Sequence, residues 1–195
     1  ARHFIYEPYR HNPIAEIAAQ YRSRKEFLFG GPALHMFVVT LRCNHTCQYC
    51  QVSRAPLGGS SHDMSQEHAS HAVNRLFESP SPVLTVEFQG GEPLLAFDRI
   101  RQIVEEIAER NEHEKRSIQF VISSTLHHLT DEILDFAKTH NIQFSTSLDG
   151  PASLHNANRP TPGKDAYERT LKGIGWVRER LGSDAVSALT TLTAK

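Results

Sequence analysis

The stretch Met36–Cys50 (MFVVTLRCNHTCQYC) decides how the rest of the sequence is interpreted. Its first six residues form a continuous apolar, β-branched run, which predicts a strand buried on both faces. Three cysteines follow at once, spaced C-x3-C-x2-C, at Cys43, Cys47 and Cys50. Chemistry in parallel α/β folds collects at the carboxyl ends of strands, so these thiols stand where an active site is expected.

Outward from this stretch, strand-like and helix-like segments alternate along the chain. Further strands are predicted at 83–88, 118–122, 142–148 and 186–192, and amphipathic helices at 65–78, 98–111, 131–139 and 166–181. In each helix, apolar side chains recur every three or four positions. This alternation predicts an α/β fold in which helices flank a parallel sheet.

Length and composition exclude several classes of protein. The chain has 195 residues, a net charge of -1 and 39% hydrophobic residues, which is enough to bury the core of one domain. A net charge near zero argues against binding to nucleic acid or a charged membrane surface, and no apolar run or signal-peptide pattern is evident. Three cysteines cannot build a disulfide framework, so a reducing, cytoplasmic setting is expected.

Residues 1–33 are predicted to be a separate N-terminal extension. They are rich in aromatic and basic residues, with one short helix expected over 14–21 and a break at Gly30-Gly31-Pro32. We expect a surface extension that packs on the core; a role in peptide recognition is the alternative.

The cysteine spacing has more than one chemical interpretation. A structural zinc ion takes four protein ligands, and His45 would be the fourth here. Three thiolates with no fourth ligand instead suit a [4Fe–4S] cluster that keeps one iron open for a substrate or cofactor. Three unrelated buried cysteines are a weaker alternative, because the chain has no other cysteine.

The C-x3-C-x2-C spacing resembles the radical S-adenosylmethionine (SAM) superfamily. In that family the three cysteines hold three irons of a [4Fe–4S] cluster, and the amino and carboxylate groups of SAM chelate the fourth. The resemblance implies that electron transfer cleaves SAM to a 5′-deoxyadenosyl radical, which abstracts a substrate hydrogen. Tyr49 matches the family's aromatic residue beside the SAM adenine.

A second motif, Gln89–Pro93 (QGGEP), follows the strand predicted at 83–88. Glycines allow close approach of the backbone, and a carboxylate accepts hydrogen bonds from an ammonium group. The motif resembles the one that holds the SAM amino group in the radical SAM family. The resemblance assigns this role to Gly90, Gly91 and Glu92.

A third motif, Ser147–Pro151 (SLDGP), closes the strand predicted at 142–148, and Arg159 follows in the next loop. A hydroxyl suits a ribose and a guanidinium suits a carboxylate. The stretch is similar to the peptide-modifying branch that includes anaerobic sulfatase-maturating enzymes, which implies SAM contacts for Ser147 and Arg159. Asp149 is a weaker candidate with a structural role. Ser123–Leu126 departs from the Thr-Asn-Gly of many relatives, which puts a ligand contact there in doubt.

The sequences of the segments Leu34–Cys43 and Cys50–Arg54 resemble those of one subgroup, the maturases of the His-Xaa-Ser peptide systems. This implies an enzyme that modifies a peptide or protein side chain and receives electrons from a flavodoxin or ferredoxin. A sulfatase-maturating type of enzyme is the alternative within the class, and a zinc-binding module without catalysis is the alternative outside it. No catalytic residue is predicted beyond the cofactor ligands.

The resemblance also implies a particular architecture. We expect residues 34–195 to form a partial (β/α) TIM-like barrel of the radical SAM type, with about five of its six strand–helix units. The sixth strand and a cysteine-rich C-terminal domain are not found in the sequence. The chain is therefore predicted to be a fragment of a longer enzyme, with an exposed sheet edge at the fifth strand.

The chain also contains 12 histidines, two pairs of which have metal-compatible spacing. His68 and His71 are three residues apart on one predicted helix, and His127 and His128 are adjacent. Solvated or capping histidines are more common than metal ligands in such pairs, so no metal site is predicted from them.

Overall fold

The computed structural model describes residues 13–193, and its central feature is one parallel sheet of five strands in the order β1-β2-β3-β4-β5. The strands are β1 (Leu34–Thr40), β2 (Val83–Gly90), β3 (Ser117–Ser123), β4 (Ile142–Ser147) and β5 (Val186–Leu189). Every pair of neighbours runs parallel. The predicted α/β class is confirmed.

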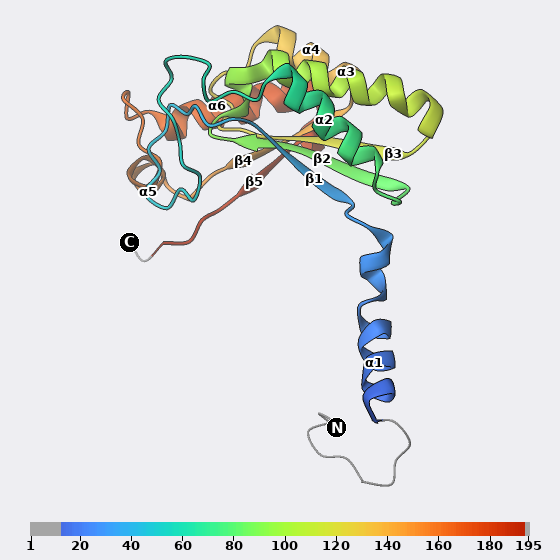
Figure 1. Ribbon diagram of the computed structural model, residues 1–195. Helices are drawn as coiled ribbons and strands as arrows, with labels where there is room; N and C mark the ends of the chain where they lie inside the picture. The colour runs from blue at the N-terminus through green and yellow to red at the C-terminus, as the bar shows by residue number, and fades with distance from the viewer. Residues whose placement is uncertain (1–12, 194–195) are drawn as a thin grey trace.

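Helices connect the strands, and the longer ones lie on one side of the sheet, whereas the seven-residue helix that follows β4 lies beside its end (Figure 1). They are α2 (Gln66–Phe77), α3 (Phe97–Glu114), α4 (Asp131–Thr139), α5 (Ala152–Asn158) and α6 (Ala166–Leu181), with short 3-10 turns η2 (Pro93–Ala96) and η3 (Ser183–Ala185). Two of these helices begin at an N-cap side chain. At α2, Ser65 accepts a hydrogen bond from the amide of His68, and at α4, Thr130 accepts one from the amide of Ile133. Helix α5 was not predicted.

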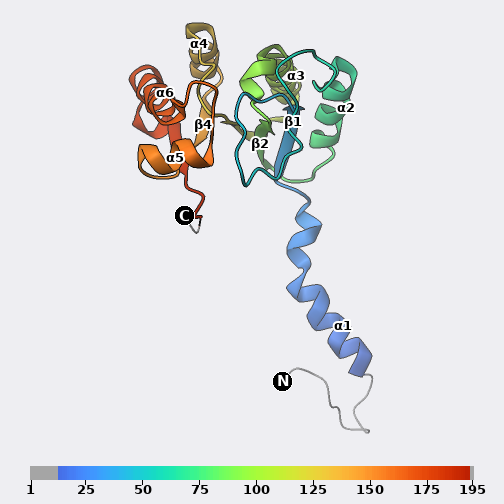
Figure 2. The same ribbon diagram turned by 90° about the vertical axis from the view of Figure 1, so that its left-hand side faces the viewer.

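The strand order identifies the architecture as part of a barrel. Each strand pairs with the next one in sequence, whereas a doubly wound sheet reverses its order at a switch point. The helices bend around the outside of the curved sheet in Figure 2. The prediction of a partial TIM-like barrel is confirmed, and β1 and β5 are the two edges of the sheet in the part of the chain that the structure describes.

The core lies between the sheet and its helices, so only one face of each strand is buried. On β1, Phe37 and Val39 are buried, but Met36 and Val38 are 60% and 46% exposed. The prediction that this strand is buried on both faces is therefore wrong. Helices cover only the outer face, and a continuous apolar run does not reveal which face lacks a cover.

The N-terminal segment extends away from this body in both views (Figures 1 and 2). Helix α1 (Pro13–Arg24) and the turn η1 (Glu26–Gly30) leave Phe27, Leu28 and Phe29 between 62% and 79% exposed. The expectation that the extension packs on the core is wrong for residues 13–30. Residues 1–12, which belong to the same predicted extension, lie outside the described residues.

Within residues 13–193, no helix has both the length and the apolar character that crossing a lipid bilayer requires.

Candidate functional site

The cysteine loop lies at the carboxyl ends of the strands, beside helix α5 (Figure 1). Its backbone is tied to the end of α5 and the residues just after it, since the amide of Gln48 donates to the carbonyl of Asn158 at 3.2 Å and that of Thr46 to the carbonyl of Pro160 at 3.0 Å. Cys43 and Cys47 are half-buried and Cys50 is exposed. The three thiols thus stand on one anchored loop.

A charged cluster fixes the start of this loop. The guanidinium of Arg42 forms an ion pair with Asp63, with Nη2 2.7 Å from Oδ2, and donates to the carbonyl of Leu95 at 2.7 Å. Asp63 also accepts from the hydroxyl of Thr40 at 2.5 Å. Burial alone would raise the pKa of Asp63, but the hydrogen bonds from Arg42 and Thr40 lower it below its usual value. The carboxylate therefore stays ionised and holds the loop against the sheet.

The Gly90–Gly91 turn fits against the end of β1 and needs both glycines. Gly90 has φ +140°, and a Cβ there would lie 2.0 Å from the carbonyl oxygen of Thr40. A Cβ on Gly91 would lie 2.3 Å from the carbonyl oxygen of Arg42. The amides of Gly91 and Glu92 donate to these same two oxygens, at 2.9 and 2.7 Å. The two glycines thus allow the backbone of this turn to approach the residues that lead into the cysteine loop.

Glu92 is fully buried, and both its carboxylate oxygens are already paired. Oε1 accepts from the amide of Leu94 at 3.1 Å and the hydroxyl of Ser124 at 2.7 Å. Oε2 accepts from the amide of Thr125 at 2.8 Å and its hydroxyl at 2.5 Å. The carboxylate therefore clamps the end of β2 to the segment after β3, a role that the sequence did not reveal.

The departure from Thr-Asn-Gly at Ser123–Leu126 has a structural counterpart. Leu126 has φ +63°, a left-handed conformation that favours glycine, yet its side chain is buried. Helix α6 makes room for it at Gly173, where a Cβ would lie 2.5 Å from the Cβ of Leu126. A leucine is accommodated there because a glycine stands opposite.

Tyr49, Asp149 and Arg159 form one network. Arg159 pairs with Asp149 (Nε to Oδ2, 3.0 Å), its guanidinium lies 5.2 Å from the centre of the Tyr49 ring, and the Tyr49 hydroxyl donates to Asp149. Burial would raise the pKa of Asp149, but bonds from Arg159, Tyr49 and the Thr191 amide lower it. Burial and the bond to Asp149 raise the pKa of Tyr49. Asp149 is thus an ionised structural centre that joins two predicted SAM-contact residues.

Ser147 ends β4 on the face of the sheet that no helix covers, and it is half-buried. Its register partner is Leu189 on β5. Ser147 and the Tyr49 network therefore lie at the same end of β4, since only Leu148 separates Ser147 from Asp149.

His45 is buried in the middle of the cysteine loop and contacts His127, which follows β3. His45 Nε2 lies 3.2 Å from His127 Nδ1, and His127 Nε2 lies 3.1 Å from the hydroxyl of Thr170. Burial lowers the pKa of His45 to about 3 and that of His127 to about 4, so both rings are neutral at pH 7. This contact joins residues 82 positions apart, and no sequence signal pointed to it.

The cysteine donor set fits an iron–sulfur cluster better than zinc. The three thiols lie within electrostatic range of one another: burial raises the pKa of Cys43 to about 11, and the charges of Glu92, Cys47 and Cys50 add to the effect. A structural zinc ion takes four protein ligands, and the one candidate for the fourth, His45, is engaged with His127. Three thiolates suit a cluster that keeps one iron open.

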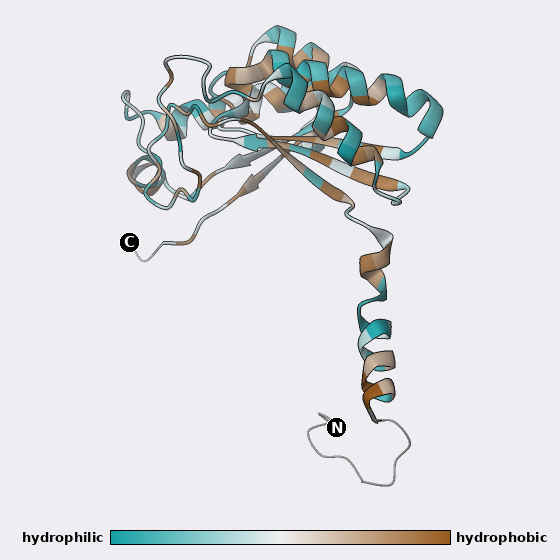
Figure 3. Ribbon diagram, in the orientation of Figure 1, coloured by the Kyte–Doolittle hydropathy of each residue, from teal (hydrophilic) through white to brown (hydrophobic). Residues whose placement is uncertain are grey.

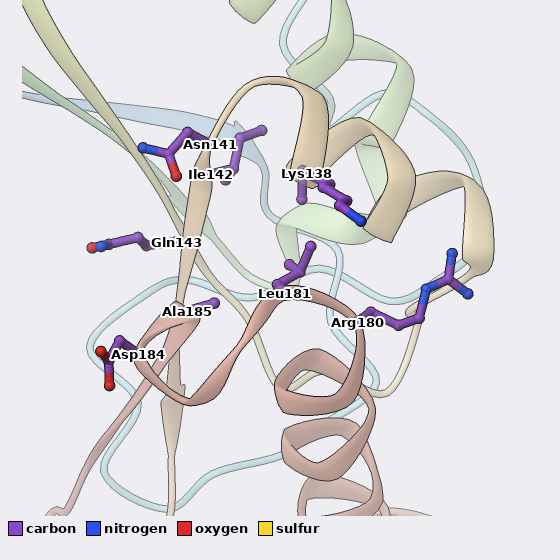
Figure 4. A pocket seen from close by; sticks show the side chains of 9 residues that line it. Lys138, Asn141, Ile142, Gln143, Arg180, Leu181, Asp184 and Ala185 are labelled. Carbon is purple, nitrogen blue, oxygen red and sulfur yellow. The ribbon is translucent and has the colours of Figure 1, made fainter.

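Two cavities illustrate which end of the sheet carries the site. One of about 510 Å³ lies beside Cys43, between the cysteine loop and the segment Pro160–Pro162. Another of about 240 Å³ lies at the opposite end of β4, between α4 and α6, where Asn141, Ile142 and Arg180 contribute to its walls (Figure 4). The second contains none of the predicted site residues.

Comparison with known proteins shows what the chain as a whole is similar to. The chain is 30% identical to an uncharacterized protein of Methanothermobacter thermautotrophicus over 165 residues, which is 83% of this chain and 58% of the relative. It is 26% identical to the serine-type anaerobic sulfatase-maturating enzyme of Bacteroides thetaiotaomicron over 70% of this chain and 34% of that enzyme. The chain spans about half the length of the curated relatives it matches. The predicted resemblance to sulfatase-maturating enzymes is confirmed.

Solved structures share the fold. The structure of anSMEcpe with bound AdoMet matches with a TM-score of 0.68 at 21% identity, over 80% of this chain and 43% of that one. The family model of the radical SAM superfamily matches residues 37–193. With four-fifths of its residues in that match, the chain belongs to the radical SAM superfamily.

Proposed function

We propose that this chain is the core of an enzyme that uses SAM-dependent radical chemistry to modify a side chain in a peptide or protein. The observation that carries the proposal is the anchored C-x3-C-x2-C loop at the carboxyl ends of a barrel-type sheet. Membership of the radical SAM superfamily supports the radical chemistry. Similarity to a sulfatase-maturating enzyme supports a peptide or protein substrate.

The superfamily's cofactors are a [4Fe–4S] cluster and SAM, as predicted, and together they supply an electron and a radical that abstracts hydrogen. Cys43, Cys47 and Cys50 are proposed to hold the cluster through their thiolates. The cysteine loop contributes Tyr49 as the side chain that flanks the adenine.

The remaining SAM contacts are proposed for residues at or after the ends of β2 and β4. The hydrogen bonds that Glu92 and Arg159 already make define how these two side chains could take part. Glu92 already accepts four hydrogen bonds, so the ammonium group is proposed to bind the Gly90–Gly91 backbone as well as the Glu92 carboxylate. Arg159 uses Nε and Nη2 on Asp149, and its remaining nitrogen is proposed to meet the SAM carboxylate. Ser147 is proposed to meet the ribose.

The proposal includes the external partners. A cytoplasmic enzyme with this chemistry needs a one-electron donor of the flavodoxin or ferredoxin type. Residues 34–195 would form the radical SAM core and residues 1–33 a separate extension. The substrate is proposed to be a His-Xaa-Ser peptide, with a sulfatase cysteine or serine as the second candidate because of the Bacteroides relative.

Anaerobic reconstitution with iron and sulfide tests the cluster. We expect about four irons per chain and an absorption band at about 400 nm. Cys47→Ser removes one ligand and abolishes the band, whereas Ser61→Ala, an exposed change in the same segment, leaves it intact. Stoichiometric zinc without iron would overturn the proposal.

Mass spectrometry tests the substrate. The chain, or the longer protein that contains it, is co-expressed with a His-Xaa-Ser peptide or with a sulfatase fragment. A mass change in the first peptide supports the His-Xaa-Ser assignment. Loss of two hydrogens from the sulfatase cysteine or serine supports the second candidate.

A further inference from the structure

Among the strand residues that the structure describes, the sheet face that no helix covers carries one charged side chain. On this face the strand residues that alternate with the buried ones are aliphatic side chains, serines, threonines and glutamines, except for Glu87 on β2. Figure 1 shows all the helices that follow β1 on or beside the other face or at the end of the sheet. One carboxylate therefore stands in an otherwise uncharged surface.

The two oxygens of Glu87 differ in their partners. Oε1 accepts from Nε2 of Gln89 at 2.7 Å and from the hydroxyl of Ser123 at 2.6 Å. Oε2 accepts no hydrogen bond from residues 13–193, and no cation in that range forms an ion pair with Glu87. Gln89 and Ser123 thus fix the orientation of the carboxylate and leave one oxygen available.

The neighbours of Glu87 on the adjacent strands are apolar. In the register of the sheet, Met36 on β1 and Val121 on β3 lie directly beside it. Glu87 itself is half-buried. A half-buried carboxylate between apolar side chains loses part of its hydration, and a cationic partner would restore that stabilisation.

The position of Glu87 relates it to the proposed SAM site. Glu87 and Gly90 lie on one strand, three residues apart, which corresponds to about 10 Å at about 3.3 Å per residue. Both are at or near the carboxyl end of β2, where chemistry collects in such sheets. A substrate side chain on this face could therefore reach Glu87 while its neighbouring residue lies near the glycine turn.

We propose that Glu87 is a specificity-determining residue that binds a cationic side chain of the substrate peptide, namely lysine, arginine or protonated histidine. The proposal rests on the proposed function, because it assumes that a peptide lies on this face. Glu87 acts through one charge-assisted hydrogen bond from Oε2, with Oε1 held in place by Gln89 and Ser123. No covalent step is assigned to it.

Peptide binding to the anaerobically reconstituted protein tests this inference. The probes are synthetic peptides of one sequence, Gly-Ser spacers around a central residue, in which that residue is lysine, arginine, histidine, glutamine, norleucine or glutamate. Binding is measured by mass spectrometry of peptides retained from an equimolar mixture at pH 6. We expect about a tenfold preference for the cationic members over glutamine and norleucine.

Three variants locate the preference. Glu87→Gln keeps the shape and removes the charge, so the preference for cationic peptides over the glutamine and norleucine peptides should disappear. Glu87→Lys should favour the glutamate peptide instead. Glu109→Gln, an exposed glutamate on α3, is the matched control and should keep the wild-type preference.

The outcomes separate this inference from the proposed function. Iron content and the visible band of every preparation report on the cluster independently of peptide binding. If the cluster forms but the wild-type protein shows no preference for cations, or if the preference survives in Glu87→Gln, the role of Glu87 is overturned and the radical SAM proposal stands. If no preparation binds iron, the proposed function itself fails.

Discussion

The carboxyl-end rim and the N-terminal arm of this chain differ in how their side chains are satisfied. The rim (segments 41–63, 89–93, 123–128 and 148–162) is polar, and several of its groups pair across long stretches of sequence, as Glu92 does with Thr125. The arm (residues 13–30) presents apolar side chains to solvent, visible as brown segments along it in Figure 3. In the arm, backbone hydrogen bonds such as those of Lys25 and Leu28 join residues at most four positions apart, whereas the rim needs strand ends that only the assembled sheet brings together.

The largest effect is expected where the rim allows no extra atom. Gly90→Ala would place a Cβ 2.0 Å from the Thr40 carbonyl oxygen at φ +140°, so we expect a loss of more than about 4 kcal/mol in the free energy of unfolding. Chemical unfolding followed by circular dichroism measures it. Gly182→Ala is the control, because its φ is +104° but no atom lies within 4 Å of a Cβ; backbone strain alone costs about 1–2 kcal/mol. Equal losses of stability in Gly90→Ala and Gly182→Ala would contradict the close approach of Gly90 to the Thr40 carbonyl.

A smaller but clear effect is expected at the buried clamp. Glu92→Gln preserves the shape but places an NH2 group where one oxygen now accepts, facing the amide of either Leu94 or Thr125, which should cost about 3 kcal/mol. The same unfolding measurement applies. Glu109→Gln on the exposed face of α3 should change the stability by less than about 0.5 kcal/mol. A near-zero change at Glu92 would show that the clamp does not form.

The contact between His45 and His127 predicts that stability falls by about 2 kcal/mol between pH 7 and pH 5. Burial lowers the pKa of His127 from 6.5 to about 4, so below pH 6.5 the unfolded chain takes up a proton that the folded chain refuses. Its contribution is complete above pH 6.5 and is lost as the pH falls toward 4. The free energy of unfolding should differ less between pH 7 and pH 5 in His127→Gln than in the wild-type protein. His71→Gln, on the exposed side of α2, should keep the wild-type difference.

Much of the fold could be predicted from the sequence, because strand and helix periodicity is local. The five strands, the four longer helices after β1 and the place of the cysteine loop follow from apolar spacing and turn residues. Helix α5 was missed because Asp149-Gly150-Pro151 indicates a turn and only seven helical residues follow it. Short helices leave too weak a periodic signal.

The pairings within the rim could not be predicted, because they depend on which strand ends meet in space. The contact of His45 with His127 and the network around Asp149 join segments 82 and 100 residues apart. Likewise, the apolar run of β1 gave no sign that Met36 and Val38 face away from the helices. Local patterns identify elements, whereas side-chain partners require the sheet order.

The smallest effect is expected in the arm. Phe29 is 79% exposed, so Phe29→Ala removes little buried surface and should change the free energy of unfolding by less than about 0.5 kcal/mol. Phe88→Ala on β2 is the matched comparison, since that ring is fully buried and its loss should cost about 3–5 kcal/mol. Chemical unfolding of both variants under one set of conditions gives the two losses in free energy of unfolding for direct comparison. A loss at Phe29 comparable to that at Phe88 would mean that the arm folds onto the body in solution, and the contrast between arm and rim would then disappear.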